Sequence, residues 1–180
     1  MYKHKVLISE KQIDERLAQL AELLNKDYEG RELDVICILK GSIIFAADLV
    51  RRLTMPVRIH FLQVSSYGED VESSGTINLR FSSVTEDLLG RNVLIVEDIL
   101  DTGITMDYLL KQLREENPGS LKVCVLVDKP SRRKIGLRAD YVGFEIEDQF
   151  VIGYGLDYQE LGRNLRYIAV LDPSEYRKSG

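Results

Sequence analysis

VLIVEDILDTGIT, residues 93–105, is the stretch that decides the fold. It opens with the continuous apolar run of a buried β-strand and closes with a Thr-Gly-Ile-Thr turn. Glu97, Asp98 and Asp101 follow the apolar run and break it. Carboxylates this close raise each other's pKa unless a cation or a row of hydroxyls lies between them. The stretch therefore predicts a strand that ends at a binding site for a polyhydroxyl group or a metal ion.

The composition around this stretch is that of an ordinary globular chain. A length of 180 residues, 44% apolar and 29% charged, predicts a single domain over residues 1–180. The formal charge of -5 argues against nucleic acid or a membrane as the main partner, although the basic segment 129–134 can attract a phosphate group. We therefore expect a small anionic substrate in a local pocket.

The cysteines and histidines limit the possible kinds of active site and the expected cellular compartment. Cys37 and Cys124 each lie in an apolar, strand-like run, where a buried thiol is expected rather than a ligand or a nucleophile. With no disulfide framework, no signal-peptide pattern and no apolar run of 18 residues, the cytoplasm is the expected location. His4 and His60 are the only histidines, which argues against a His-based triad or a zinc site.

Periodicity places the remaining elements. Ser9 and Gln12 form a capping-box pattern ahead of apolar residues at helical spacing. The polar stretch 66–83 has one strand-like piece, at 77–81, and predicts a flap over about 65–82. Alternation of strands and helices predicts an α/β fold: an open, mainly parallel twisted sheet with helices on both faces. We expect helices over 10–26, 42–53 and 105–116, and strands over 34–39, 57–65, 92–97, 121–127, 140–146, 150–155 and 165–171.

The turn after the central strand is the expected ligand site. In an open parallel sheet, ligands bind beyond the carboxyl ends of the strands, where backbone amides point at them. Gly103 can adopt positive φ, and two hydroxyls and a helix N-terminus adjoin it, so the turn suits one phosphate monoester. A structural alternative is that Asp101 or Thr102 merely caps the following helix. That alternative leaves Glu97 and Asp98 unexplained.

Other phosphate-binding motifs fit less well. The chain has neither the GxxxxGK[ST] loop of P-loop NTPases nor the GxGxxG pattern of dinucleotide-binding folds. Receiver domains carry a similar acidic strand near their beginning, whereas here 92 residues precede it. A receiver domain would therefore leave the front half of the chain unexplained.

The stretch 93–105 is similar to the phosphoribosyl-diphosphate motif of type I phosphoribosyltransferases. ILKGSIIFAADLVRRL, SSYG, LVDKPSRRK and YVGFEIEDQFVIGYGLDYQE together resemble the hypoxanthine (guanine) phosphoribosyltransferases, in the same order and over nearly the whole chain. The resemblance implies the type I fold with a small hood and a flexible flap. It also implies purine salvage: Mg²⁺-dependent transfer of phosphoribosyl from phosphoribosyl diphosphate to hypoxanthine or guanine, giving the nucleotide and pyrophosphate.

The resemblance also assigns roles within the acidic stretch. It implies that Glu97 and Asp98 contact the ribose hydroxyls and a Mg²⁺ ion. Asp101 is implied as the general base, or the hydrogen-bond partner, at purine N7. The 5′-phosphate is implied to bind the loop of Asp101, Thr102, Gly103, Ile104 and Thr105.

The remaining implied contacts come from other segments. The resemblance implies that Lys129 recognises purine O6, that Phe150 stacks on the ring, and that Val151 and Asp157 complete the base and metal site. It implies a cis peptide at Leu39–Lys40, as often in the family. The residues implied for pyrophosphate are Lys40, Gly41, Ser66, Tyr67 and Arg163.

Several alternatives stay open at this point. Taken alone, Lys129 also fits a solvated loop residue, Phe150 fits core packing and Arg163 fits a surface arginine. Ser42 and Ile104 depart from the family pattern, the latter at a place often held by lysine. A xanthine-preferring enzyme, or a phosphoribosyl-diphosphate-sensing regulator that binds nucleic acid, remain alternatives. A homodimer or homotetramer is expected from the family alone.

Overall fold

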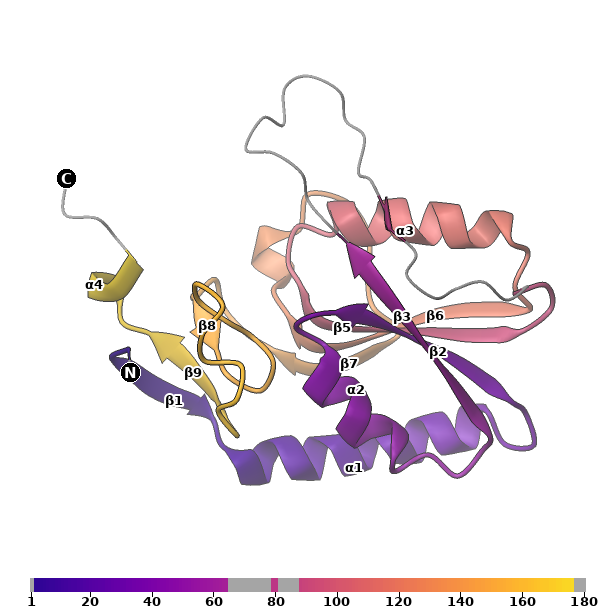
Figure 1. The fold of residues 1–180 in the computed structure, drawn as a ribbon, viewed down its shortest axis with the longest axis horizontal. Helices are drawn as coiled ribbons and strands as arrows, with labels where there is room; N and C mark the ends of the chain where they lie inside the picture. The colour runs from indigo at the N-terminus through magenta and orange to yellow at the C-terminus, as the bar shows by residue number, and fades with distance from the viewer. Residues whose placement is uncertain (1, 65–78, 81–87, 177–180) are drawn as a thin grey trace, which may run out of the picture.

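The computed structural model describes residues 2–64, 79–80 and 88–176 (Figure 1). Most of the predicted flap, including Ser66 and Tyr67, lies outside these ranges, so the flap stays a prediction. The strand-like piece expected at 77–81 contains the short strand β4 (Leu79–Arg80), which pairs antiparallel with β3.

The main sheet is open and mainly parallel, as the alternation of elements predicted. Its strand order is β4-β3-β2-β5-β6-β7, with five parallel strands and β4 as an antiparallel edge. The order reverses between β2 and β5, because the chain builds outward in opposite directions from these two central strands. The parallel strands are β2 (Leu33–Leu39), β3 (Val57–Val64), β5 (Asn92–Leu100), β6 (Ser120–Asp128) and β7 (Tyr141–Glu145).

Helices cover both faces of this sheet (Figure 1). In β2, Val35 and Cys37 pack with α1 (Glu10–Asp27) and α2 (Ile43–Val50), whereas Ile36 packs with α3 (Ile104–Glu115). This two-residue alternation lets a continuous apolar strand fill two cores. The capping box is confirmed, since the Ser9 side chain accepts from Gln12 N and the Gln12 side chain accepts from Ser9 N. The helix predicted over 42–53 is shorter in the structure, since α2 ends at Val50 and the chain then forms a turn.

A second, smaller sheet lies beyond the carboxyl ends of the main strands and forms the expected hood (Figure 1). It pairs β1 (His4–Ile8), β9 (Ile168–Leu171) and β8 (Val151–Ile152) antiparallel, and α4 (Pro173–Tyr176) follows it. The sequence pattern did not indicate β1, which is largely exposed. The strands expected over 150–155 and 165–171 are shorter, and β8 ends at Ile152 because Gly153 takes a φ of 102°.

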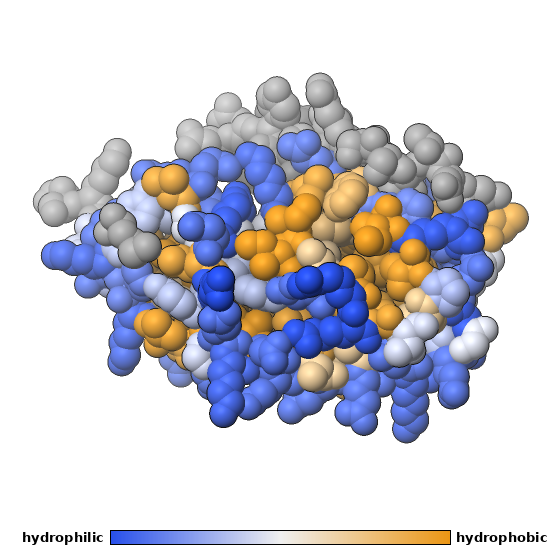
Figure 2. Space-filling view, turned by 60° about the horizontal axis from the view of Figure 1, so that its bottom comes forward, coloured by the Kyte–Doolittle hydropathy of each residue, from blue (hydrophilic) through white to orange (hydrophobic). Residues whose placement is uncertain are grey.

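The surface combines charged and apolar regions. Figure 2 brings the α1 side forward and shows hydrophilic side chains over its lower part, with apolar side chains gathered across the middle. Ile43 at the start of α2 and Ile59 of β3 are 42% and 48% exposed. Within the ranges that the structure describes, no helix has the length and apolar character needed to cross a membrane.

β5 is longer than predicted, and its extra residues lie beyond the point where it stops pairing with β2. The strand expected over 92–97 continues through Glu97 and Asp98 to Leu100, so the prediction that the acids end the strand is wrong. Pairing explains the difference: β6 keeps its register partners on β5 as far as Leu100, whereas β2 pairs with β5 only as far as Val96. Beyond Val96 the two central strands separate, and the acidic residues lie at that opening.

Candidate active site

Three adjacent strands bring the predicted site residues together. The chain leaves β2 into Lys40 and Gly41, leaves β5 into Asp101, and leaves β6 into Lys129. Because β2, β5 and β6 are parallel neighbours, these loops emerge at one edge of the sheet, where the strand order reverses. That switch point is where open α/β sheets bind ligands.

Glu97 and Asp98 form an acidic shelf at this edge. The Asp98 backbone N–H donates to Glu97 Oε1 at 3.2 Å. Burial of the Glu97 carboxyl group, and then the hydrogen bond and charge of Asp98, raise the pKa of Glu97 well above its ordinary value. Burial and the neighbouring carboxylate thus both disfavour an ionised Glu97, and a cation or hydroxyl groups would offset this.

Gly41 lies directly against this shelf. A Cβ atom on Gly41 would lie 1.6 Å from Asp98 Oδ2 and 2.5 Å from Asp98 Cγ, so a side chain there must displace the Asp98 carboxyl group. The backbone of the loop after β2 thus packs against the Asp98 side chain of β5. The glycine permits this approach because it has no Cβ.

The shelf suits a hard cation that retains other ligands. Glu97 and Asp98 offer the carboxylate oxygens that Mg²⁺ prefers. No group of three His, Cys, Asp or Glu side chains able to hold a metal occurs within residues 2–64, 79–80 and 88–176. Asp157, which the resemblance implies as a further metal ligand, pairs with Arg163 at 2.7 Å in this structure. A metal on the shelf would therefore complete its shell with water and substrate oxygens, as Mg²⁺ commonly does.

The turn after β5 has the predicted conformation. Gly103 has a φ of 83° and is the N-cap residue of α3, with no side-chain capping hydrogen bond. The Asp101 carboxylate accepts a hydrogen bond from Arg132 rather than capping the helix, and Thr102 Oγ1 accepts only a long bond, 3.4 Å, from Ile104 N. A small cavity of about 110 Å³ lies over this turn. It is lined by Ile38, Glu97, Ile99, Leu100, Asp101, Thr102, Gly103, Thr105, Met106 and Leu109.

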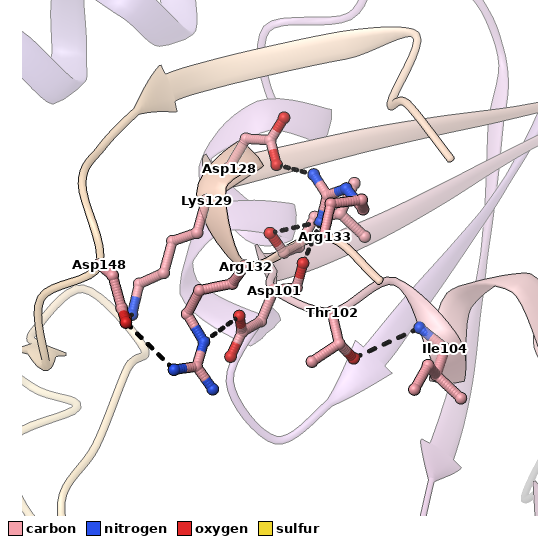
Figure 3. Close-up of polar contacts among 9 residues, drawn as sticks. Asp101, Thr102, Ile104, Asp128, Lys129, Arg132, Arg133 and Asp148 are labelled. Carbon is pink, nitrogen blue, oxygen red and sulfur yellow. Dashed lines mark hydrogen bonds and ion pairs between the residues drawn. The ribbon is translucent and has the colours of Figure 1, made fainter. Parts of the chain in front are cut away.

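The segment after β6 holds this turn in place (Figure 3). Backbone N–H groups of Lys129 and Lys134 donate to the carbonyls of Leu100 and Thr102, both at 3.0 Å. The Arg133 guanidinium donates to the carbonyls of Leu100 and Asp101 and pairs with Asp128. The guanidinium of Arg133 and two backbone N–H groups of the basic segment 129–134 thus fix the turn.

A larger cavity of about 470 Å³ adjoins the turn on the hood side. Asp101 and Ile99 line both cavities, so Asp101 stands where they meet. The larger cavity combines apolar walls with a few charged groups, which is typical of small-molecule sites. Its lining consists of Ile99, Asp101, Lys129, Arg132, Asp148, Phe150, Val151, Leu156 and Tyr176.

Lys129 is a buried residue of this cavity, with a relative exposure of 7%, so the solvated-loop alternative is wrong. Burial lowers the pKa of its ammonium group, while Asp101 and Asp148 act in the opposite direction. Its Nζ lies 3.9 Å from an Asp148 oxygen. The ammonium group is therefore a hydrogen-bond donor that little water surrounds.

Phe150 and Val151 supply the apolar wall. Phe150 is 38% exposed, so the core-packing alternative is wrong. Its ring stacks on Tyr176 of α4 at 5.2 Å between centroids and meets Tyr158 edge-on at 5.5 Å. Val151 is buried in β8 and pairs with Val170. Phe150 and Tyr176 thus give the cavity an aromatic wall.

Of the residues predicted to bind pyrophosphate, Lys40, Gly41 and Arg163 lie together beside the shelf, whereas Ser66 and Tyr67 lie outside the described residues. The cis peptide at Leu39–Lys40 is confirmed. Arg163 donates to Gly155 O at 2.8 Å, and its buried Nε has no hydrogen-bond partner among the described residues. A Cβ on Gly155 would lie 2.0 Å from Gly41 O, so this loop packs on the Gly41 backbone. Arg163 is thus bound into the site loops, and the surface-arginine alternative is wrong.

Sequence reasoning missed several residues of the larger cavity, above all Arg132, Asp148 and Tyr176. Arg132 bonds to Asp101, 31 residues away, and to Asp148, 16 residues away. No local spacing links such residues. The available signal was the basic segment 129–134, which indicated an anion without indicating which side chains face the cavity.

Comparisons with known proteins agree with this geometry. Residues 9–159 match the model of the phosphoribosyl transferase domain family. The chain is 43% identical to the hypoxanthine-guanine phosphoribosyltransferase of Bacillus subtilis, over 98% of this chain and 99% of that protein. It is 45% identical to the enzyme of that name from Streptococcus pneumoniae, over 96% and 95% of the two chains.

Solved structures show the same fold. A crystal structure of a hypoxanthine-guanine phosphoribosyltransferase from Bacillus anthracis, with a HEPES molecule in its active site, superposes with a TM-score of 0.89 and 44% identity, covering 96% of this chain and 100% of that one. A hypoxanthine phosphoribosyltransferase from Staphylococcus aureus gives a TM-score of 0.91 and 42% identity, covering 97% and 94%.

Proposed function

This chain belongs to the phosphoribosyl transferase domain family, and on that premise we propose that it is a hypoxanthine-guanine phosphoribosyltransferase of purine salvage. The enzyme transfers phosphoribosyl from phosphoribosyl diphosphate to hypoxanthine or guanine. The observation that carries the proposal is the meeting of two cavities at Asp101, one suited to a flat base and the other to a sugar phosphate.

The larger cavity suits a purine. Phe150 offers a ring face for stacking, and the buried Lys129 ammonium offers a donor to a carbonyl oxygen such as O6. Val151 adds backbone groups at the same wall. The smaller cavity, with Glu97 on one side and the turn 101–105 on the other, suits the ribose hydroxyls and the 5′-phosphate.

The reaction needs a proton acceptor between the two subsites. The N9–C1′ bond forms while the bond from C1′ to the pyrophosphate oxygen breaks, and positive charge develops on the ribose as in other oxocarbenium-like transfers. The proton on purine N7 must then leave, and the Asp101 carboxylate stands at the junction to accept it or to hold it by a hydrogen bond.

Pyrophosphate would leave beside the shelf. Backbone donors of Lys40 and Gly41 and the guanidinium of Arg163 would hold it. Ser66 and Tyr67 are proposed to close over the pyrophosphate, which would exclude water from the oxocarbenium-like centre.

We further propose that Mg²⁺ binds the acidic shelf with the sugar and the pyrophosphate, and that Asp157 serves a second metal contact. The ion would supply charge neutralisation to the leaving group. Removing Mg²⁺ with a chelator is expected to abolish turnover, and added Mg²⁺ is expected to restore it. Titration calorimetry with phosphoribosyl diphosphate should show weaker binding without the metal. Full turnover in the chelated enzyme would contradict the proposal.

Lys129→Ala is expected to raise the KM for hypoxanthine about 10-fold to 100-fold, because a hydrogen bond from a charged donor contributes about 1.5–3 kcal/mol. The KM for phosphoribosyl diphosphate should hardly change. Steady-state kinetics with each substrate varied in turn measures both. Lys134→Ala is the matched control, since this exposed lysine lies in the same segment. An equal loss for both substrates would mark Lys129 as structural.

The choice of base decides between neighbouring functions. A spectrophotometric assay with hypoxanthine, guanine, xanthine and adenine side by side is expected to show turnover of the first two. Faster turnover of xanthine would favour the xanthine-preferring alternative. Absence of turnover with all four bases, together with duplex binding that weakens steeply with salt, would favour the nucleic-acid-binding regulator.

We also propose that the enzyme works in the cytoplasm and associates with further copies of itself, as a homodimer or homotetramer. Free, buried Cys37 and Cys124 agree with a reducing compartment. Exposed apolar side chains such as Ile43 and Ile59 agree with association. Sedimentation of the purified chain gives its mass in solution, and a monomer at all concentrations would contradict the proposal.

A further inference from the structure

Arg132 lies between two carboxylates (Figure 3) and lines the larger cavity. Its Nε lies 2.7 Å from Asp101 Oδ1, and its Nη1 lies 3.2 Å from Asp148 Oδ2. All three residues line the cavity that is proposed to bind the purine. Neither the sequence motif nor the proposed roles above assign Arg132 or Asp148 a function.

We propose that Arg132 is a positioning residue for Asp101: it holds the Asp101 carboxylate by Oδ1 so that Oδ2 faces N7 of the bound purine. This inference rests on the proposed function. Asp148 is the anchor that fixes the other end of the guanidinium.

The contacts favour this role because a carboxylate turns freely about its bonds unless one oxygen is held. A carboxylate has two acceptor oxygens, so one bond to Arg132 leaves the other oxygen for the substrate. The planar guanidinium carries its donors in a fixed fork, and binding Asp101 and Asp148 through two different nitrogens sets its orientation. A lysine could not join both carboxylates in this fixed geometry.

The backbone of Asp101 is held from the other side. Arg133 donates to the carbonyls of Leu100 and Asp101 and pairs with Asp128. Two consecutive arginines therefore fix the main chain and the side chain of Asp101 separately. Such fixation matters because a misplacement of about 1 Å in a reacting group can lower the rate about 100-fold.

A role in stability is a poor explanation for the Arg132 contacts. The side chains of Arg132, Asp101 and Asp148 are 44%, 37% and 53% exposed. Ion pairs this exposed contribute little to folding. Arg132→Ala should therefore fold like the parent, and its effect should fall on turnover.

The test is a double-mutant cycle on kcat with Arg132→Ala, Asp101→Ala and the double variant. We expect Arg132→Ala to lower kcat at least about 10-fold, with the KM for phosphoribosyl diphosphate unchanged. In the Asp101→Ala background, the same substitution should lower kcat no further. Arg132→Lys should recover part of the loss. Arg138→Ala, at an exposed arginine of the following loop, is the matched control and should retain parental kcat.

Additive effects in the cycle would overturn the inference, because they would show that Arg132 acts independently of Asp101. A parental or higher kcat in Arg132→Ala would also overturn it. A second readout does not depend on turnover: in a crystal structure of Arg132→Ala, the Asp101 carboxyl group should turn away from its parental orientation, and an unchanged orientation would overturn the inference. An inactive parent enzyme would contradict the proposed function, whereas this structural readout would still decide the role of Arg132.

Discussion

Asp101→Ala is expected to lower kcat by roughly 10²–10⁴-fold, the usual contribution of a positioned general acid or base. Asp101 stands where the two cavities meet, so its carboxylate lies between the subsites proposed for the purine and the ribose. The substitution removes the proposed acceptor for the N7 proton but leaves Lys129 and the shelf in place. The KM values should therefore change much less than kcat. Steady-state kinetics with hypoxanthine and guanine measures both quantities.

Asp107→Ala is the matched control for this prediction. Asp107 lies in the first turn of α3, close in sequence to Asp101, but its carboxylate pairs with Lys111 at 2.6 Å. The control should keep kcat near the parental value. Unchanged kcat in Asp101→Ala would refute the role assigned to this carboxylate. A higher KM with unchanged kcat would show that Asp101 only helps to bind substrate.

Gly41→Ala is expected to lower kcat/KM for phosphoribosyl diphosphate about 100-fold. The new Cβ would start 1.6 Å from Asp98 Oδ2, so the Asp98 carboxyl group must move by more than 1 Å to reach an ordinary contact. Displacement of a reacting or metal-binding group by about 1 Å is enough for a loss of this size. Kinetics with phosphoribosyl diphosphate varied, and circular dichroism of the fold, measure the effect.

Gly136→Ala is the matched control for Gly41→Ala. A Cβ on Gly136 would meet no atom within 4 Å, so the same chemical change there adds no clash. This variant should keep parental kinetics. Parental activity in Gly41→Ala would show that the Asp98 carboxyl group need not lie where the structure places it, and would remove the argument that Gly41 and the shelf act together.

The fold was largely predictable because its strands are short apolar runs separated by amphipathic helices. A strand such as β2, apolar at nearly every position, indicates burial on both faces and hence a parallel sheet with two helical layers. Element ends were less predictable, since tertiary pairing sets them. β5 extends to Leu100 because β6 continues beside it, and local polarity at Glu97 gave no sign of this. The exposed strand β1 escaped detection because only its last residue is buried.

The residues of the candidate site were also only partly predictable from the sequence. Residues that follow strands, such as Lys40, Asp101 and Lys129, could be placed together because parallel strands deliver their carboxyl ends to one edge. Contacts between distant loops could not. The bond from Arg132 to Asp101 and the packing of Gly155 on Gly41 depend on how the hood and the β6 loop fold back over that edge, which no spacing in the sequence encodes.

If the two cavities form one site divided at Asp101, a crystal structure of the chain with the product nucleotide inosine monophosphate will show the nucleotide across both of them. The base is expected in the larger cavity, with O6 at Lys129, N7 at Asp101 and the ring against Phe150. The ribose is expected at Glu97 and Asp98 and the phosphate in the turn 101–105. A nucleotide bound elsewhere, or with its base over the shelf, would show that the two cavities do not form this site.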